Sequence, residues 1–279
     1  MGARRGGRVG LKIAVAGKGG AGKTTVCALL AGVLSRAGQR ILLVDLDSDP
    51  NLSSALGFPA DAAQPLVHRK ELIAERTGST GEPGGMFLLN PRVSDIAEKF
   101  ALKRTERIFL LPVGTIETAG EGCFCPQAAF VKALVRRLLL DEKETLLLDL
   151  EAGLESFGRS VVEGLDLLLI VVEPGMRSVD TARRILAMAS SLGVRAIRVV
   201  ANKVRPENLQ TLRTRMRENG VPLDLTLSYR EEFARRDLDG VGVFDFPDPT
   251  FEEDALRMLQ AVISSRRTQS GVAAGGGAQ

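Results

Sequence analysis

The sequence predicts an α/β fold, with a mainly parallel, twisted sheet of about seven or eight strands and helices on both faces. Apolar runs of strand length alternate along the chain with segments of helical periodicity. Most of these runs are apolar at consecutive positions, as strands covered on both faces require. A glycine-rich loop follows the first run directly, which is typical of the first turn in such folds.

The first strand is expected at Leu11–Ala16, followed by the glycine loop and a helix over Thr24–Ala37 that ends at Gly38. Arg40–Asp45 is the second expected strand. The others are Met86–Leu89, Ile108–Val113, Thr145–Leu150, Leu167–Val172, Ala196–Ala201 and Leu223–Leu227. Further helices are expected at Pro126–Leu140, Ser178–Leu192, Glu207–Asn219 and Thr250–Arg267, and a short one around Glu71–Glu75 within an otherwise loop-like stretch.

Length and composition favour one folded domain over residues 11–268, between a basic, flexible arm at 1–10 and a disordered tail at 269–279. The 279 residues are 44% hydrophobic and 25% charged, which is typical of globular chains. The longest apolar run, Leu165–Val172, is far shorter than the roughly 20 residues of a membrane span. No signal peptide is recognisable, so we expect a soluble, cytoplasmic protein. The net charge of +3 is weak evidence for a polyanionic partner.

Residues 17–25, GKGGAGKTT, match the phosphate-binding pattern G-x-x-x-x-G-K-[ST] between a predicted strand and a predicted helix. Glycines allow backbone N–H groups to surround phosphate oxygens, so ATP or ADP is the expected ligand. Lys23 should reach the β- and γ-phosphates, and the Thr24 hydroxyl should ligate Mg²⁺. A plain glycine turn is the alternative, which the strand–loop–helix context disfavours. The expected phosphate-loop residues are Gly17, Lys18, Gly19, Gly20, Ala21, Gly22, Lys23, Thr24 and Thr25.

Carboxylates follow two of the strands expected beside this loop. Asp149 ends the run TLLLD and is expected to contact Mg²⁺ directly or through water. Asp45, Asp47 and Asp49 follow RILLV, and Asp45 and Asp49 are equally compatible with loop or capping roles. The Gly153 N–H is a candidate contact to the γ-phosphate.

A second candidate contact to the nucleotide is Asn202-Lys203, directly after the strand RVVA. The Asn202 carboxamide is suited to read the adenine edge. An ordinary turn after a strand is the competing interpretation of this pair.

Cys123 and Cys125 lie in GEGCFCP, just before a helix that begins near Pro126. In an extended segment residues two apart point to the same side, so two thiolates can converge on one soft metal ion such as Zn²⁺, Ni²⁺ or Cu⁺. Two sulfurs cannot close a tetrahedral site, and a second protomer is the simplest source of the others. Two incidental thiols in a loop are the alternative. Cys27 is expected to be a small core residue.

The pattern KGGxGKTT resembles the deviant Walker A motif of the MinD, ParA and nitrogenase iron protein group. This resemblance implies that Lys18 reaches across a nucleotide-sandwich dimer to the partner's phosphates. It also implies that Asp47 positions the hydrolytic water and meets Mg²⁺ through water. Ser48 departs from the group, whose members often have Pro there.

Over Lys12 to about Arg267 the chain resembles CooC-type ATPases, which mature carbon monoxide dehydrogenase by helping to insert nickel. The resemblance implies a homodimer that holds one Ni²⁺ or Zn²⁺ on Cys123 and Cys125 of both protomers, while ATP hydrolysis gates metal release to carbon monoxide dehydrogenase. Ser156 stands where the family tends to have His. The most specific segments are GKGGAGKTT (17–25), LLNPRVSDIAEKF (88–100), GEGCFCPQAAFVKALV (120–135), DLEAGLESFGR (149–159) and VVEPGMRSVDTA (171–182).

Two other functions are compatible with the motif. A ParA- or MinD-like positioning ATPase would need a basic DNA-binding face or an amphipathic membrane helix, and acidic residues 252–254 oppose binding of the last helix to anionic lipid. An electron donor like the nitrogenase iron protein would take cluster cysteines from two separate loops, whereas here both lie in one. We therefore expect neither nucleic acid nor membrane as a partner.

Overall fold

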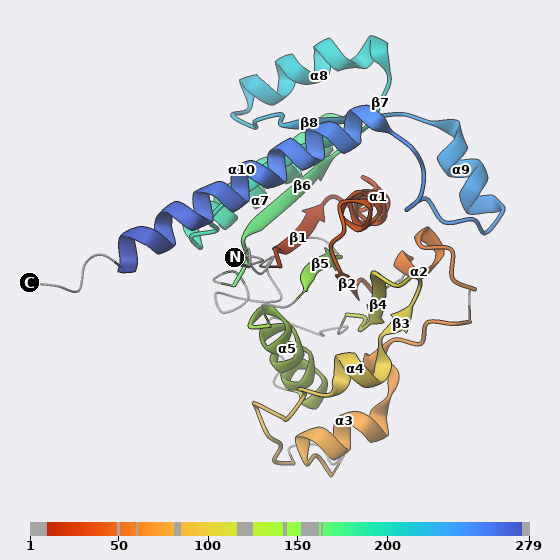
Figure 1. The fold of residues 1–279 in the computed structure, drawn as a ribbon, viewed down its shortest axis with the longest axis vertical. Helices are drawn as coiled ribbons and strands as arrows, with labels where there is room; N and C mark the ends of the chain where they lie inside the picture. Colours follow the sequence, from red (N-terminus) through yellow and green to blue (C-terminus); the bar gives the residue numbers. More distant parts are fainter. Residues whose placement is uncertain are drawn as a thin grey trace, which may run out of the picture.

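The computed structural model describes residues 10–48, 51–59, 61–80, 85–115, 125–141, 144–151, 162 and 164–274, with side chains up to Ser264. Within these residues eight strands form one sheet in the order β3-β4-β2-β5-β1-β6-β7-β8 (Figure 1). Neighbouring strands are parallel except at the β3 edge, where β3 runs antiparallel to β4. The predicted mainly parallel sheet is confirmed.

Seven of the eight predicted strands are present, with bounds shifted by at most a few residues. The strands are β1 Lys12–Gly17, β2 Ile41–Leu46, β3 Leu102–Lys103, β4 Ile108–Pro112, β5 Thr145–Leu150, β6 Leu167–Val172, β7 Ile197–Val204 and β8 Leu225–Ser228. The prediction of a strand at Met86–Leu89 was wrong. That segment pairs with none of the described strands, and Met86, Leu88 and Leu89 are 92%, 59% and 65% exposed.

The predicted helices are all present. They are α1 Lys23–Arg36, α3 Lys70–Thr77, α5 Pro126–Leu139, α7 Met176–Ser191, α8 Pro206–Glu218 and α10 Pro249–Ala274. Three short α-helices and one 3₁₀ turn were not expected: α2 Leu52–Ala55, α4 Ile96–Phe100, α9 Glu231–Leu238 and η1 Leu66–His68. Helix α10 continues past Arg267 to Ala274.

Both faces of the sheet are covered, as consecutive apolar positions in the strands predict. Along β1, Ile13 and Val15 point to one face and pack with α1 and α10. Ala14 and Ala16 point to the other face, which α5, α7 and α8 cover. Because side chains alternate along a strand, a strand buried on both sides is apolar at most of its positions. This accounts for the runs visible in the sequence.

Helix α10 contacts α1 and β8 through one stripe of its surface. Phe251, Ala255, Leu259 and Val262 lie about one helical turn apart and are at most 4% exposed. The amphipathic pattern of this helix is therefore explained by packing onto the protein core. None of the helices in the described part of the chain is long and apolar enough to cross a membrane.

Candidate nucleotide-binding site

The glycine loop lies at the carboxyl end of β1, in the middle of the sheet. Strand β1 is flanked by β5 on one side and by β6 on the other. The connection that leaves β1 runs to β2 on the β5 side, whereas the connection that leaves β5 crosses β1 to reach β6, so the strand order reverses here. The carboxyl edge at such a reversal is where ligands bind in open α/β sheets. The neighbouring strand ends therefore deliver Asp149 and Glu173 to the two sides of the loop.

Two of the loop glycines are required by close packing as well as by backbone conformation. Gly17 has φ +148°, and a Cβ there would lie 2.4 Å from the Val171 carbonyl oxygen of β6. Gly22, the N-cap of α1, has φ +89°, and a Cβ would lie 2.1 Å from Nδ2 of Asn202. Any side chain at either position would displace the loop from the adjoining strand.

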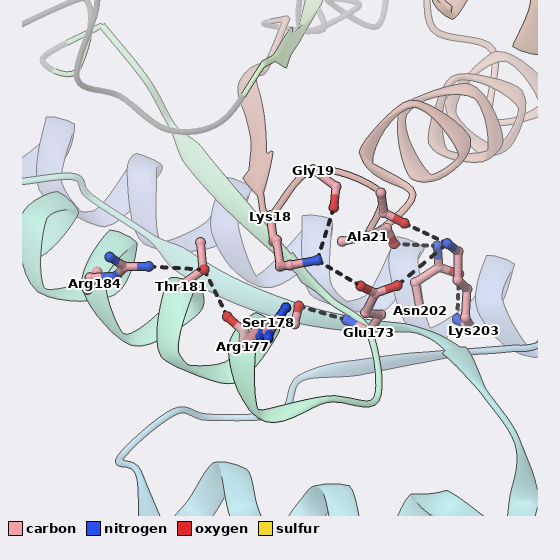
Figure 2. A network of polar contacts seen from close by, with 11 residues as sticks. Lys18, Gly19, Ala21, Glu173, Arg177, Ser178, Thr181, Arg184, Asn202 and Lys203 are labelled. Carbon is pink, nitrogen blue, oxygen red and sulfur yellow. Dashed lines mark hydrogen bonds and ion pairs between the residues drawn. The ribbon is translucent and has the colours of Figure 1, made fainter.

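Three successive carbonyl groups of the loop are held by side chains (Figure 2). Lys18 Nζ donates to the Gly19 oxygen at 3.4 Å, Lys203 Nζ to the Gly20 oxygen at 2.5 Å, and Asn202 Nδ2 to the Ala21 oxygen at 2.9 Å. Side-chain donors that occupy the carbonyls fix the peptide planes of a loop whose amides must serve an anion. This arrangement favours a phosphate ligand.

Asn202 has a structural role that the sequence did not indicate. The side chain is 3% exposed, and besides its bond to Ala21 its Oδ1 accepts the Lys203 amide at 2.8 Å. Lys203 itself has φ +57°, the one positive value among the described non-glycine residues. Asn202 thus ties the end of β7 to the phosphate loop, and its predicted contact to adenine stays a prediction.

Asp45 and Asp149 lie opposite each other on the adjacent strands β2 and β5. Asp45 is buried, and its carboxylate accepts the amides of Asp47 and Leu52, both at 3.1 Å. Its negative charge therefore has two backbone donors. These bonds organise the loop after β2, which confirms the capping interpretation for Asp45.

Asp149 is in the opposite situation. It is fully buried, and neither carboxylate oxygen has a hydrogen-bond partner among the described residues. Burial, followed by the charge of Asp45, raises the pKa of Asp149 to about 7. The Thr24 hydroxyl and the Lys23 ammonium oppose this rise, but the hydroxyl does not reach either oxygen with good hydrogen-bond geometry.

A buried carboxylate without a donor, next to a P-loop threonine, fits the expected Mg²⁺ position. The cation would add to the Lys23 charge and further stabilise the ionised Asp149 carboxylate. Asp47 is half-buried nearby, and Ser48 Oγ donates to Glu151 Oε1 at 3.0 Å, joining the ends of β2 and β5. No group of three or more potential metal-ligating residues occurs in the described part of the chain. Asp49 and Gly153 lie outside the described residues.

A cavity of about 400 Å³ adjoins the end of the loop and the start of α1. Its walls include Thr24, Thr25, Asn202, Lys203, Tyr229 and Phe233. The guanidinium of Arg205 lies 4.0 Å above the Tyr229 ring. Our sequence reasoning missed the two aromatic residues, although Tyr229, the only tyrosine of the chain, directly follows the last strand.

Of the cysteine pair, only Cys125 lies within the described residues. It is the N-cap of α5, and its Sγ accepts the Ala128 amide at 3.4 Å. Cys125 is partly exposed, with extended backbone dihedral angles. Cys27 is fully buried in the core, as predicted, and burial with the nearby charges of Asp149 and Asp45 raises its pKa well above the usual value.

A glycine loop between a central parallel strand and a helix, facing a buried acidic strand end, defines a P-loop nucleotide-binding protein. Residues 12–243 match the family model "CobQ/CobB/MinD/ParA nucleotide binding domain", and the chain belongs to this family.

Similarity to individual proteins is more specific than the family match. The chain is 47% identical over 197 residues to the carbon monoxide dehydrogenase accessory protein CooC of Rhodospirillum rubrum, covering 70% of this chain and 74% of that protein. It is 39% identical over 232 residues to an uncharacterized ATP-binding protein of Methanocaldococcus jannaschii, covering 82% and 90%. Among solved structures, the MinC:MinD cell division complex of Aquifex aeolicus matches with a TM-score of 0.65 at 20% identity, covering 90% and 96%. The structural match shows the shared fold alone.

Proposed function

We propose that this protein is an ATP-dependent maturation factor that carries nickel or zinc at a homodimer interface and assists nickel insertion into carbon monoxide dehydrogenase. The observation that carries this proposal is the 47% identity to the CooC accessory protein, which extends over most of both chains. The phosphate loop and the buried Asp149 carboxylate, whose oxygens accept no hydrogen bond within the described residues, supply the nucleotide half of the proposal. Cys123 and Cys125 supply the metal half.

In the nucleotide half, ATP lies on the phosphate loop with its base in the cavity beside Tyr229 and Phe233. Lys23 contacts the β- and γ-phosphates, while Thr24 and Asp149 hold Mg²⁺ and Asp47 orients the attacking water. Bound Mg²⁺ would neutralise charge that develops on the phosphate oxygens. Gly153 contacts the γ-phosphate, and Lys18 reaches the phosphates of the partner protomer.

In the metal half, each chain provides two of four sulfur ligands. The half-exposed sulfur of Cys125 at the start of α5 accepts the Ala128 N–H, which holds the side chain at the beginning of the helix. The metal is cargo for the client enzyme. One helix, α5, leads from Cys125 toward β5 and Asp149, so a change at the nucleotide has a short route to the metal ligands.

The test is elemental analysis of the purified dimer after nickel or zinc loading. About one metal ion per two chains is expected, and Cys123→Ser or Cys125→Ser should remove it. Cys27→Ala is the matched control, because this cysteine is buried behind the phosphate loop and should leave the metal content unchanged. One metal ion per chain, or retention of metal without Cys123 and Cys125, would contradict the shared site.

The positioning-ATPase alternative has less support. The apolar stripe of α10 up to Val262 is buried against α1 and β8, so this stripe is not available to bind lipid. Co-sedimentation with DNA and with anionic vesicles, with and without ATP, measures this alternative directly. Strong ATP-dependent binding to either would favour it over metal delivery.

A further inference from the structure

Glu173 lies between two lysines at the edge of the phosphate loop (Figure 2). Its Oε1 is 3.4 Å from Nζ of Lys18, and its Oε2 is 3.6 Å from Nζ of Lys203. The three side chains are 27%, 37% and 45% exposed, respectively. One carboxylate thus bridges the first lysine of the loop and the lysine at the end of β7.

The position of Glu173 is fixed by the sheet. It directly follows β6, whose Val171 pairs with Gly17 at the end of β1, so the carboxylate and Lys18 leave neighbouring strands at the same level. The Glu173 amide also donates to Ser178 Oγ at 3.1 Å, which joins it to the first turn of α7. The backbone of Glu173 is therefore anchored on both sides, while the ammonium groups of the lysines are carried on long, flexible side chains.

Lys18 and Lys203 differ in the contacts that they make besides Glu173. Lys203 donates to the Gly20 carbonyl oxygen, and its own amide is bonded to Asn202. Besides Glu173, Lys18 contacts only the carbonyl oxygen of its neighbour Gly19 at 3.4 Å among the interactions described. If Lys18 left, Lys203 would remain as a counter-ion, so Glu173 would not be left as an unpaired charge.

We propose that Glu173 is a positioning residue that holds Lys18 on its own chain and thereby restrains formation of the ATP-bound dimer. This inference rests on the proposed function, in which Lys18 reaches the partner's phosphates. A lysine held by a carboxylate of its own chain must break that contact before it can cross an interface. A half-exposed ion pair is weak, so the restraint is modest and easily overcome by bound ATP.

The experiment compares wild type with Glu173→Gln, which removes the charge and keeps the shape. The first measurement is amine labelling of Lys18 in nucleotide-free protein, read by peptide mass spectrometry. We expect labelling about 2–5-fold faster in the variant. The second is the dimer dissociation constant with Mg²⁺ and a non-hydrolysable ATP analogue, by analytical ultracentrifugation, which should fall about 2–5-fold.

Glu252→Gln is the matched control, because Glu252 and Arg36 form an ion pair of similar exposure far from the loop. It should change neither Lys18 labelling nor the dimer constant. Unchanged labelling in Glu173→Gln would overturn the inference, as would a dimer no tighter than that of wild type. If wild type itself stays monomeric with the analogue, the proposed dimer fails and the restraint fails with it, whereas failure of the variant alone leaves the proposed function intact.

Discussion

Asp45 and Asp149 are adjacent carboxylates with opposite surroundings. Asp45 accepts two backbone amides, whereas Asp149 is buried without a donor among the described residues and has a pKa raised to about 7. The unfolded chain loses this proton near the ordinary aspartate value of about 4, while the folded, nucleotide-free protein keeps it up to about pH 7. The contribution of Asp149 to the free energy of unfolding therefore falls as pH rises through this window.

Asp149→Asn is expected to stabilise the nucleotide-free protein at pH 8 by on the order of 1–3 kcal/mol, with a gain that shrinks toward pH 4. The same variant should lose the thermal stabilisation that Mg²⁺ with ADP gives wild type. Urea unfolding at several pH values without Mg²⁺ measures the first effect. Asp45→Asn is the control, and it should lower the free energy of unfolding by about 1–3 kcal/mol, because it weakens the two charge-assisted hydrogen bonds from the Asp47 and Leu52 amides. Destabilisation by Asp149→Asn at pH 8 would contradict this account.

At the scale of elements, the start of α1 and the end of β7 are joined by one close contact. A Cβ on Gly22 would meet Asn202 Nδ2 at 2.1 Å, and that same nitrogen holds the Ala21 carbonyl. Gly22→Ala should therefore destabilise the protein through both a steric clash and its φ of +89°. Asn202→Ala should cost about 1–3 kcal/mol, because it leaves a buried carbonyl without a partner.

Combining the two changes removes the clash, while the backbone strain at residue 22 and the lost bond to the Ala21 carbonyl remain. The double variant Gly22→Ala/Asn202→Ala should be more stable than the sum of the single losses predicts, by about 1–2 kcal/mol. Chemical unfolding of all four proteins gives this coupling directly. Strictly additive losses would show that the side chain and the loop are independent.

Element prediction from the sequence succeeded where a local signal was present. Helices α5 and α8 begin with Pro126 and Pro206 and have clear periodicity, and both were predicted to within two residues at each end. The strand predicted at Met86–Leu89 was wrong, because an apolar run does not reveal whether a neighbouring strand is available to pair with it. The short helices α2, α4 and α9 offer too few turns for periodicity to detect.

At the scale of the whole molecule, strand order was the information that the sequence lacked. The parallel sheet followed from apolar runs, but nothing local places β5 between β2 and β1 or β6 beside β1. That strand order places Asp149 opposite Asp45 and places Glu173 within ion-pair distance of Lys18. The phosphate loop could be proposed residue by residue because its chemistry is contiguous in the sequence, whereas Glu173 and Asn202 come from strand ends more than a hundred residues away.

The proposed dimer carries two ligands, and their affinities must be linked. If four thiolates need two chains and ATP closes two chains, then nucleotide raises metal affinity, and metal tightens the ATP-bound dimer by the same factor. We expect a coupling of about 5–150-fold, the usual range for such linkage. Zinc affinity with and without a non-hydrolysable ATP analogue, and the dimer constant with and without zinc, give two independent values of it. In Cys125→Ser the dimer constant should no longer respond to zinc. If zinc affinity is the same with and without the ATP analogue, the nucleotide and metal sites are not coupled. ATP-gated metal delivery would then have no basis.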